Sequence, residues 1–347
     1  MPSQAGVTRQ QVQASNSRID AESYPRTAVF VGGTSGIGEA VIQGLAAVGK
    51  GKWPARIYIV GRQESAERVN ESLERVRAEH PGLDLIWTPG DVSLLADVQR
   101  ICLELKEKEK SLDLLWLSAG YAPIGGREET KEGLIISQSL GHYSRILFIQ
   151  HLLPLLKASP TQGRVVSVLA AGEESANVIL DDLNLEKPGN FTWYKCLYHT
   201  LTMHSVTMEQ LAEDNKNATF IHAAPGLVDT GNLNRGWRGR WVFQLVMTIV
   251  LTPLYLLRAI TIEESRDRML YLVTSAKYGG HGVPLGEGVP PGLTTRGEKT
   301  GGLFLVNNNC ATIANEKVFA KLRKEAKGRI VAKTTEVLQP YMPSTES

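Results

Sequence analysis

The chain has 347 residues, of which 42% are hydrophobic and 21% charged, and its formal net charge at pH 7 is +2. This length suits one large domain with its own core, and the nearly balanced charge gives no support for a nucleic-acid partner. The three cysteines, Cys102, Cys196 and Cys310, form no CxxC pair, which argues against a disulfide framework and against a zinc or other metal site. A reducing compartment, the cytoplasm, is therefore expected.

The two ends of the chain are predicted to be tails. Residues 1–25 are polar, rich in Gln, Ser and Ala, and contain no apolar run of the kind a secretory signal needs. They are predicted to be disordered, and residues 339–347 are predicted to be a tail as well. One domain is expected over residues 26–338.

Between the tails, short apolar runs rich in β-branched residues alternate with longer helical stretches. Strands are predicted over Thr27–Val31, Arg56–Val60, Asp84–Thr88, Leu112–Leu117, Arg164–Leu169, Ala218–Ala223 and Gly302–Val306, and helices over residues 36–48, 64–79, 93–110, 131–157, 192–214 and 314–337. Continuously apolar strands suit a parallel sheet that is covered on both faces. The alternation predicts a doubly wound α/β fold of the Rossmann type, which binds ligands at the carboxyl ends of its strands.

The first predicted strand leads directly into a glycine-rich loop that opens a predicted helix. In such a loop Gly32 can make the tight turn, Gly36 lets the backbone approach a pyrophosphate, and Gly38 lets the helix pack close to the sheet. The alternative is a surface turn that happens to hold glycines, but the strand-turn-helix context favours a nicotinamide dinucleotide site. The loop residues predicted to bind the cofactor are Gly32, Thr34, Ser35, Gly36, Ile37 and Gly38.

The second predicted strand ends at Val60-Gly61-Arg62. An acidic residue here would bond the ribose 2′-hydroxyl of NAD, whereas a guanidinium can form a bidentate pair with the 2′-phosphate of NADP. The alternative is a solvated arginine at a strand end. Arg62 therefore favours NADP(H) as the cofactor.

With these features the sequence resembles the short-chain dehydrogenase/reductase family over about residues 26–335. The spacing of GGTSGIG is similar to that family's TGxxxGxG loop, and Ser118-Ala119-Gly120 is similar to its NAG turn with Ser in place of Asn. The resemblance implies an adenine contact from Asp91 and Val92, and nicotinamide-side contacts from Pro225, Gly226, Val228 and Thr230. It implies that Ser118, Ala119 and Gly120 also contact the cofactor. It also implies a homo-oligomer that pairs through the helices after the fourth and fifth strands.

The sequences of the segments at residues 163–167 and 303–308 are similar to those of fungal members of this family. Those members tailor polyketides or other secondary metabolites. The resemblance therefore implies a lipophilic small-molecule substrate.

The family's catalytic pattern of Asn, Ser, Tyr and Lys is not matched. Gln138 stands at the Asn position, and Leu169-Ala170 at the Ser position offers no side-chain hydrogen-bond donor. The Tyr position falls on Trp193 or Tyr194, and the Lys position on Leu197 or Tyr198. The candidate catalytic residues are therefore Tyr194, as proton donor, with Tyr198 and Gln138.

Tyr194 and Tyr198 are four residues apart, so they share one helical face, with His199 beside it. Local packing of these rings is an equally weighted alternative to catalysis. Without a lysine to stabilise phenolate, a tyrosine with an ordinary pKa of about 10 can act as an acid more readily than as a base. The missing lysine therefore favours reduction over oxidation.

Residues 241–260 form an apolar run that approaches the length of a transmembrane helix. Gln244 and Pro253 interrupt it, and in the resembled family this region is the substrate loop. A substrate lid, extending over about residues 235–262, is favoured over peripheral membrane contact and over a true span.

Three functions remain open from the sequence. The first is an NADPH-dependent oxidoreductase that acts on a carbonyl or hydroxyl group of a lipophilic metabolite. The second is an isomerase or cyclase without net redox chemistry, and the third is a nucleotide-binding pseudoenzyme. The unmatched catalytic residues keep the second and third alternatives open.

Overall fold

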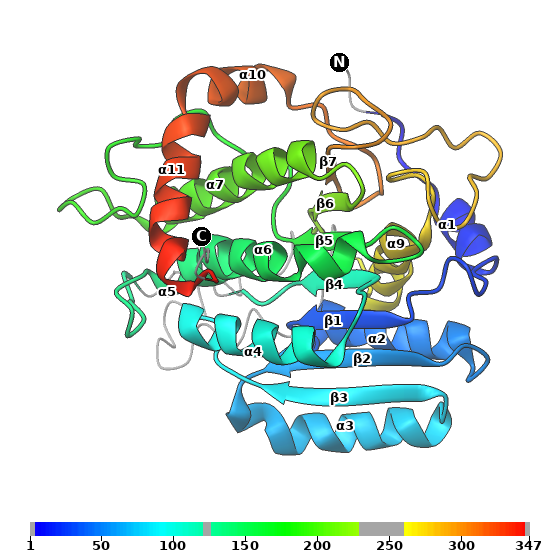
Figure 1. Ribbon diagram of the computed structural model, residues 1–347. Coiled ribbons are helices and arrows are strands. Elements are labelled where there is room, and N and C mark those ends of the chain that lie inside the picture. The colour runs from blue at the N-terminus through cyan, green and yellow to red at the C-terminus, as the bar shows by residue number, and fades with distance from the viewer. Residues whose placement is uncertain (1–3, 121–125, 229–259, 344–347) are drawn as a thin grey trace, which may run out of the picture.

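The computed structural model describes residues 4–120, 126–228 and 260–343. Seven parallel strands form one sheet in the order β3-β2-β1-β4-β5-β6-β7 (Figure 1). The strands are β1 (Thr27–Val31), β2 (Ala55–Gly61), β3 (Leu83–Pro89), β4 (Leu114–Leu117), β5 (Arg164–Val168), β6 (Thr219–Ala223) and β7 (Leu303–Val306). All seven predicted strands are present, and the doubly wound fold is confirmed.

Helices cover both faces of the sheet because alternate residues of each strand point to opposite sides. On one face the core contains Val29 and Val31 together with the helices α4 (Leu95–Lys108), α6 (Ser144–Lys157) and α7 (Trp193–Asp214). The other face packs Ala28 and Phe30 against α2 (Gly36–Gly49), α3 (Ala66–Glu79) and α9 (Ile262–Thr274). The shorter elements are η1 (Gln63–Ser65), α5 (Ile136–Gln138), the π-helical turn η2 (Ser139–Tyr143), α10 (Glu316–Glu325) and α11 (Lys327–Leu338).

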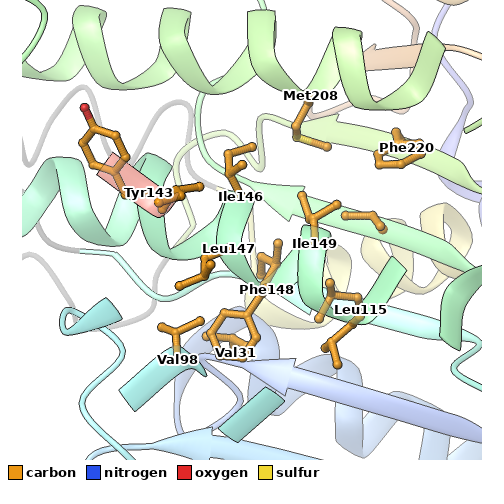
Figure 2. Packing of buried hydrophobic residues seen from close by; sticks show 14 of the residues in the cluster. Val31, Val98, Leu115, Tyr143, Ile146, Leu147, Phe148, Ile149, Met208 and Phe220 are labelled. Carbon is orange, nitrogen blue, oxygen red and sulfur yellow. The ribbon is translucent and has the colours of Figure 1, made fainter. Parts of the chain in front are cut away.

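The helix α6 lies in the middle of its layer, between α4 and α7 (Figure 1). Four consecutive residues, Ile146–Ile149, are fully buried and project toward α4, α7 and the sheet, as Figure 2 shows. A run of apolar residues that is buried on successive sides of the helix is typical of such a central position. The polar residues that α6 does bury therefore need a specific explanation.

The predicted disordered N-terminal tail is wrong for the part that the structure describes. Residues Arg9–Asn16 form helix α1, which begins with a capping box between Thr8 and Gln11. Val12 and Tyr24 from this region are buried in the core beside α9. The apolar residues are too sparse to give a helical period, so this segment is ordered by its packing against α9, a helix that the sequence also did not predict.

The predicted C-terminal tail is also ordered as far as residue 343. Helix α11 continues into the short turn η4 (Gln339–Tyr341), and the ring nitrogen Nε2 of His151 hydrogen-bonds the Tyr341 carbonyl at 2.9 Å. The C-terminal segment is therefore held against α6 through His151, and the predicted disorder of this tail is wrong as far as residue 343.

The apolar run at 241–260 lies outside the described residues except for Ile260, which pairs with Val228 in an isolated bridge. Within the described ranges, no helix combines the length and hydropathy that crossing a membrane requires. The lid, membrane-contact and span alternatives for the run therefore stay predictions.

Candidate active site

The glycine loop packs tightly against the turn that follows β4. Gly32 has a φ of +97°, and a Cβ atom added there would lie 2.5 Å from the backbone nitrogen of Ala119. A Cβ atom on Gly38 would lie 2.4 Å from the Gly32 carbonyl oxygen. Helix α2 begins at Gly36, whose φ is +62°. The loop therefore has the glycines where side chains cannot fit, and its backbone meets a helix N-terminus suited to a pyrophosphate.

Ser118 connects this loop to β4. Its hydroxyl accepts a hydrogen bond from the Trp116 indole at 2.9 Å and donates to the Gly32 carbonyl at 3.2 Å. The backbone nitrogens of Ser118 and Ala119 both donate to the Val31 carbonyl, at 2.8 and 3.0 Å. The serine at this position thus holds the turn and the glycine loop together.

Two arginines lie beside the same loop. The end of β2 adjoins it, because a Cβ atom added to Gly61 would lie 2.5 Å from Cγ2 of Thr34. Arg62, the next residue, is exposed, and its guanidinium makes no hydrogen bond or ion pair with the described part of the chain, while its carbonyl accepts from the backbone nitrogen of Ser65 at 2.9 Å. Arg68, on the first turn of α3, donates from Nη1 to the Thr34 carbonyl at 2.8 Å. Sequence reasoning missed Arg68, although its spacing of six residues from Arg62 was a usable signal.

Asp91 lies between β3 and the start of α4. Its Oδ1 atom accepts hydrogen bonds from the backbone nitrogen and the hydroxyl of Ser93, at 3.0 and 2.7 Å. The neighbouring Val92 is buried in the core that surrounds α4. The carboxylate is thus oriented at the carboxyl edge of the sheet, where the resemblance implies an adenine contact.

The Pro225-Gly226 turn follows β6. Gly226 has a φ of +75°, and a Cβ atom there would lie 2.9 Å from Cβ of Asn308, so only glycine fits. Val228 is the last residue before the segment outside the described ranges, and Thr230 falls within that segment. The turn is therefore where a nicotinamide-side contact was expected, and Asn308 is a close neighbour that the sequence did not indicate.

The first turns of α7 present two opposite faces. Because α7 connects two parallel strands, its N-terminal residues lie at the carboxyl edge of the sheet. Tyr194 and Tyr198 share one face and are 46% and 38% exposed. On the other face the Sγ atom of Cys196 lies 3.2 Å from the Ser137 hydroxyl, and Thr200 lies against Gly141. The tyrosines are accessible to a ligand, whereas the opposite face packs against α5 and η2.

The side chains of Gln138 and His199 on this side form hydrogen bonds with backbone groups. The Gln138 amide nitrogen donates to the Leu183 carbonyl at 2.9 Å, and the residue is 1% exposed. His199 accepts from the backbone nitrogen of Ile179 at 3.1 Å and bonds Leu183 through Nδ1, and burial lowers its pKa. Both side chains therefore hold the segment between β5 and α7 in place.

At the end of β5 the sequence offers only Leu169 and Ala170, and the buried polar group nearby is Arg145. Its Nη2 atom donates to the Ala119 carbonyl at 2.8 Å, and its Nη1 atom donates to the Ser167 hydroxyl at 2.7 Å and the Val168 carbonyl at 2.9 Å. Burial lowers the pKa of Arg145 to about 9, so the guanidinium remains a cation at neutral pH. Sequence reasoning did not single out this residue.

Three histidines are buried behind the same edge. His142 and His222 each have a pKa lowered by burial to about 3, and the pKa of His204 is lowered well below its ordinary value, first by burial and then by the neighbouring His222, Arg145 and His142. Since the Ser167 hydroxyl accepts from Arg145, it donates to Nε2 of a neutral His204 at 2.7 Å. These histidines are therefore uncharged parts of the core.

Comparisons with known proteins agree with this geometry. The model of the short chain dehydrogenase family matches residues 26–178. Among curated proteins, the chain is 35% identical to the oxidoreductase andH of Emericella variicolor, over 90% of this chain and 91% of that one. It is 32% identical to the short-chain dehydrogenase/reductase SAT2 of Stachybotrys chartarum, over 86% of this chain and 87% of that one.

Solved structures show the same fold at low identity. The NADPH-bound carbonyl reductase from chicken fatty liver aligns with a TM-score of 0.54 and 18% identity, over 83% of this chain and 98% of that one. The NADP complex of RhlG from Pseudomonas aeruginosa aligns with a TM-score of 0.50 and 22% identity, over 72% of this chain and 89% of that one.

Proposed function

The chain belongs to the short-chain dehydrogenase/reductase family, and on that premise we propose that it is an NADPH-dependent reductase of a carbonyl group on a lipophilic metabolite. The observation that carries the proposal is the geometry of the glycine loop between β1 and α2. The glycine loop has close backbone packing and a helix N-terminus, the Arg68 guanidinium bonds the loop through the Thr34 carbonyl, and Arg62 follows Gly61, which adjoins Thr34. Relatives named oxidoreductases and fold neighbours solved with NADPH or NADP give further support.

The choice of NADPH over NADH rests on charge. Arg62 is exposed next to Thr34, and Arg68 already reaches the Thr34 carbonyl. A guanidinium pairs well with a phosphate dianion, so these side chains favour a cofactor that carries a 2′-phosphate. NADH offers no such group at this position.

The proposed substrate is lipophilic because exposed apolar side chains gather at the carboxyl edge. Among the described residues, five large apolar or aromatic side chains are exposed, and four of them, Trp193, Tyr194, Tyr198 and Leu227, belong to the start of α7 or to the turn after β6. Exposed apolar side chains at the carboxyl edge of such a sheet are typical of a ligand-binding site. The fungal origin of the relatives suggests a secondary metabolite such as a polyketide.

When bound, NADPH would supply a hydride to the carbonyl carbon, and the carbonyl oxygen would take up a proton to give an alcohol. We propose that Tyr194 donates that proton. Its hydroxyl makes no hydrogen bond with the described part of the chain, so it is available to a substrate oxygen. Leu169 and Ala170, which follow β5, have no hydroxyl that could share this task, and the Ser167 hydroxyl is buried and bonded to Arg145 and His204.

Cofactor titration tests the proposal. We expect NADPH to bind at least about tenfold more tightly than NADH, and Arg62→Ala to weaken NADPH by roughly 10- to 100-fold while leaving NADH unchanged, as for loss of a charge-assisted hydrogen bond. Oxidation of NADPH should then be followed with a panel of lipophilic ketones and aldehydes. Equal affinity for the two cofactors would contradict the assignment.

A second candidate function is a dinucleotide-binding protein without net redox chemistry, either an isomerase or cyclase or a pseudoenzyme. It is favoured by Leu169 and Ala170 after β5, which lack a hydroxyl, and by Gln138, whose amide is bonded to Leu183. Tight NADPH binding without oxidation by any carbonyl in the panel would support it over the reductase.

A further inference from the structure

Arg145 is a buried cation that has no buried anion beside it. The four hydrogen-bond acceptors of its guanidinium are the carbonyl oxygens of Leu140, Ala119 and Val168 and the hydroxyl of Ser167. All four are neutral, and no ion pair involves Arg145 within the described residues. A charge held in this way stays nearly unscreened by solvent.

The titratable groups that face this guanidinium do not cancel its charge. His204 adjoins it through Ser167, and His142 and His222 lie next in line, with ring centroids 6.3 and 5.3 Å from that of His204. All three are neutral. The buried carboxylate of this region, Glu174, lies beyond them, where it bonds Ser205 at 2.8 Å.

The cation lies directly beneath the carboxyl edge of the sheet. Arg145 is at the start of α6, so its side chain reaches the ends of both β4 and β5. A Cβ atom added to Gly120, which is exposed, would lie 4.0 Å from Nη2 of Arg145. The guanidinium is therefore separated from the exposed surface of the turn Ser118-Ala119-Gly120 by little more than one backbone layer.

We propose that Arg145 supplies, from beneath the carboxyl edge, the positive potential that the family's lysine would supply from the position that Leu197 or Tyr198 occupies on α7. The inference rests on the proposed function. A cation beneath the nicotinamide end of the site disfavours the positively charged ring of NADP⁺ relative to the neutral ring of NADPH, and it stabilises negative charge that develops on a carbonyl oxygen. Arg145 is thus a positioning residue that selects the reduced cofactor.

The structure offers a matched control at the other end of the same strand. Arg164 is also buried, and it donates to the carbonyl oxygens of Leu272, Ser275, Tyr278 and His281. Since it begins β5, it lies at the amino edge of the sheet, away from the cofactor loops. Loss of either arginine removes a comparable set of hydrogen bonds, but only Arg145 lies beneath the carboxyl edge.

The test is the ratio of the dissociation constants for NADP⁺ and NADPH, measured by fluorescence titration and calorimetry at pH 7. We expect the wild-type protein to bind NADPH more tightly, and Arg145→Met or Arg145→Gln to reduce the ratio by about fivefold or more. Arg145→Lys should retain most of the ratio, because the charge remains. Arg164→Met should leave it unchanged, even if both affinities fall.

Two outcomes overturn the inference alone. One is equal wild-type affinity for the two redox forms, which needs no variant and so stands even if the substitutions prevent folding. The other is a folded Arg145→Met protein with an unchanged ratio. Failure to bind either form would instead refute the dinucleotide site, and the inference with it.

Discussion

The predicted site residues at the two ends of the sheet's carboxyl edge differ in whether they act through the backbone or through side chains. At β1 the predicted residues act through the backbone: Gly32 and Gly38 leave room for close packing, and α2 begins where a phosphate is expected. The residues Arg62 and Asp91, which follow β2 and β3, add charged side chains to this end. At β4, β5 and β6 the predicted residues depend on side chains, and Gln138 is bonded to a carbonyl instead of facing a ligand.

The two ends also differ in what is buried beneath them. The β4–β6 end contains Arg145 and the histidines His142, His204 and His222, all of which are fully or almost fully buried. The core on the β1–β3 side that packs against α2 and α3 is built from apolar residues such as Phe30, Ile57 and Ile59. The difference teaches that the β1–β3 end is held by apolar packing, whereas the β4–β6 end carries buried polar groups that cost stability and respond to pH.

The largest expected effect is acid lability of the β4–β6 end. His142, His204 and His222 have lowered pKa values in the folded state, so below pH 6.5 the unfolded chain binds protons that the folded chain does not. The contribution of these histidines to the free energy of unfolding is therefore fully present above pH 6.5 and is lost as pH falls below it. Each group contributes about 1.4 kcal/mol per pH unit, while burial raises the pKa of Glu174 and acts in the opposite direction, so we expect a slope of roughly 3 to 4 kcal/mol per pH unit.

Urea unfolding at pH 7.5, 6.5 and 5.5 measures this slope. His142→Phe removes one of the three groups, so it should lower the slope by about 1.4 kcal/mol per pH unit in the same experiment. A free energy of unfolding that stays constant between pH 7 and 5 would show that the histidines are not held neutral.

The next largest effect concerns Tyr194. General acid catalysis contributes about 10²- to 10⁴-fold, so Tyr194→Phe should lower turnover of the best carbonyl in the panel by roughly that factor and leave NADPH binding intact. Tyr198→Phe, on the same exposed face, is the control. Loss of activity in Tyr198→Phe alone would move the proton donor by one helical turn, and full activity in both variants would favour the functions without net redox chemistry.

The contrast between the two ends explains how much the sequence could predict. The strands and the glycine loop follow from local patterns, because an apolar run or a glycine at a tight turn has one dominant structural meaning. Arg145 could not be predicted, because no pattern in the sequence marks which residue at the start of α6 will meet the ends of β4 and β5. The order of α1 could not be predicted either, because it depends on packing against α9.

Ser118 tests the boundary between the two ends, since it bonds both Trp116 of β4 and the Gly32 carbonyl. We expect Ser118→Ala to lower the free energy of unfolding by about 1 to 2 kcal/mol, because the indole donor loses its partner. NADPH affinity should fall only a few-fold, since the glycines remain. Thermal unfolding and cofactor titration measure the two effects. An unchanged free energy of unfolding would show that the two hydrogen bonds of the Ser118 hydroxyl do not stabilise the protein.

The smallest expected effect is that of Arg68. Its guanidinium is exposed and already bonded to the Thr34 carbonyl, so its pairing with a 2′-phosphate is screened by solvent. We therefore expect Arg68→Ala to weaken NADPH by only about two- to fivefold, against the larger loss in Arg62→Ala. Arg75→Ala is the matched control, because Arg75 is exposed on the same helix and bonds the Glu71 carbonyl. This variant should leave the affinity for NADPH unchanged.

The double variant of Arg62 and Arg68 shows whether the two side chains act together. If both hold the same phosphate, the double variant will lose less affinity than the product of the two single losses. Independent losses would mean that Arg68 acts only by holding the glycine loop, in which case NADH binding would fall by the same factor as NADPH binding.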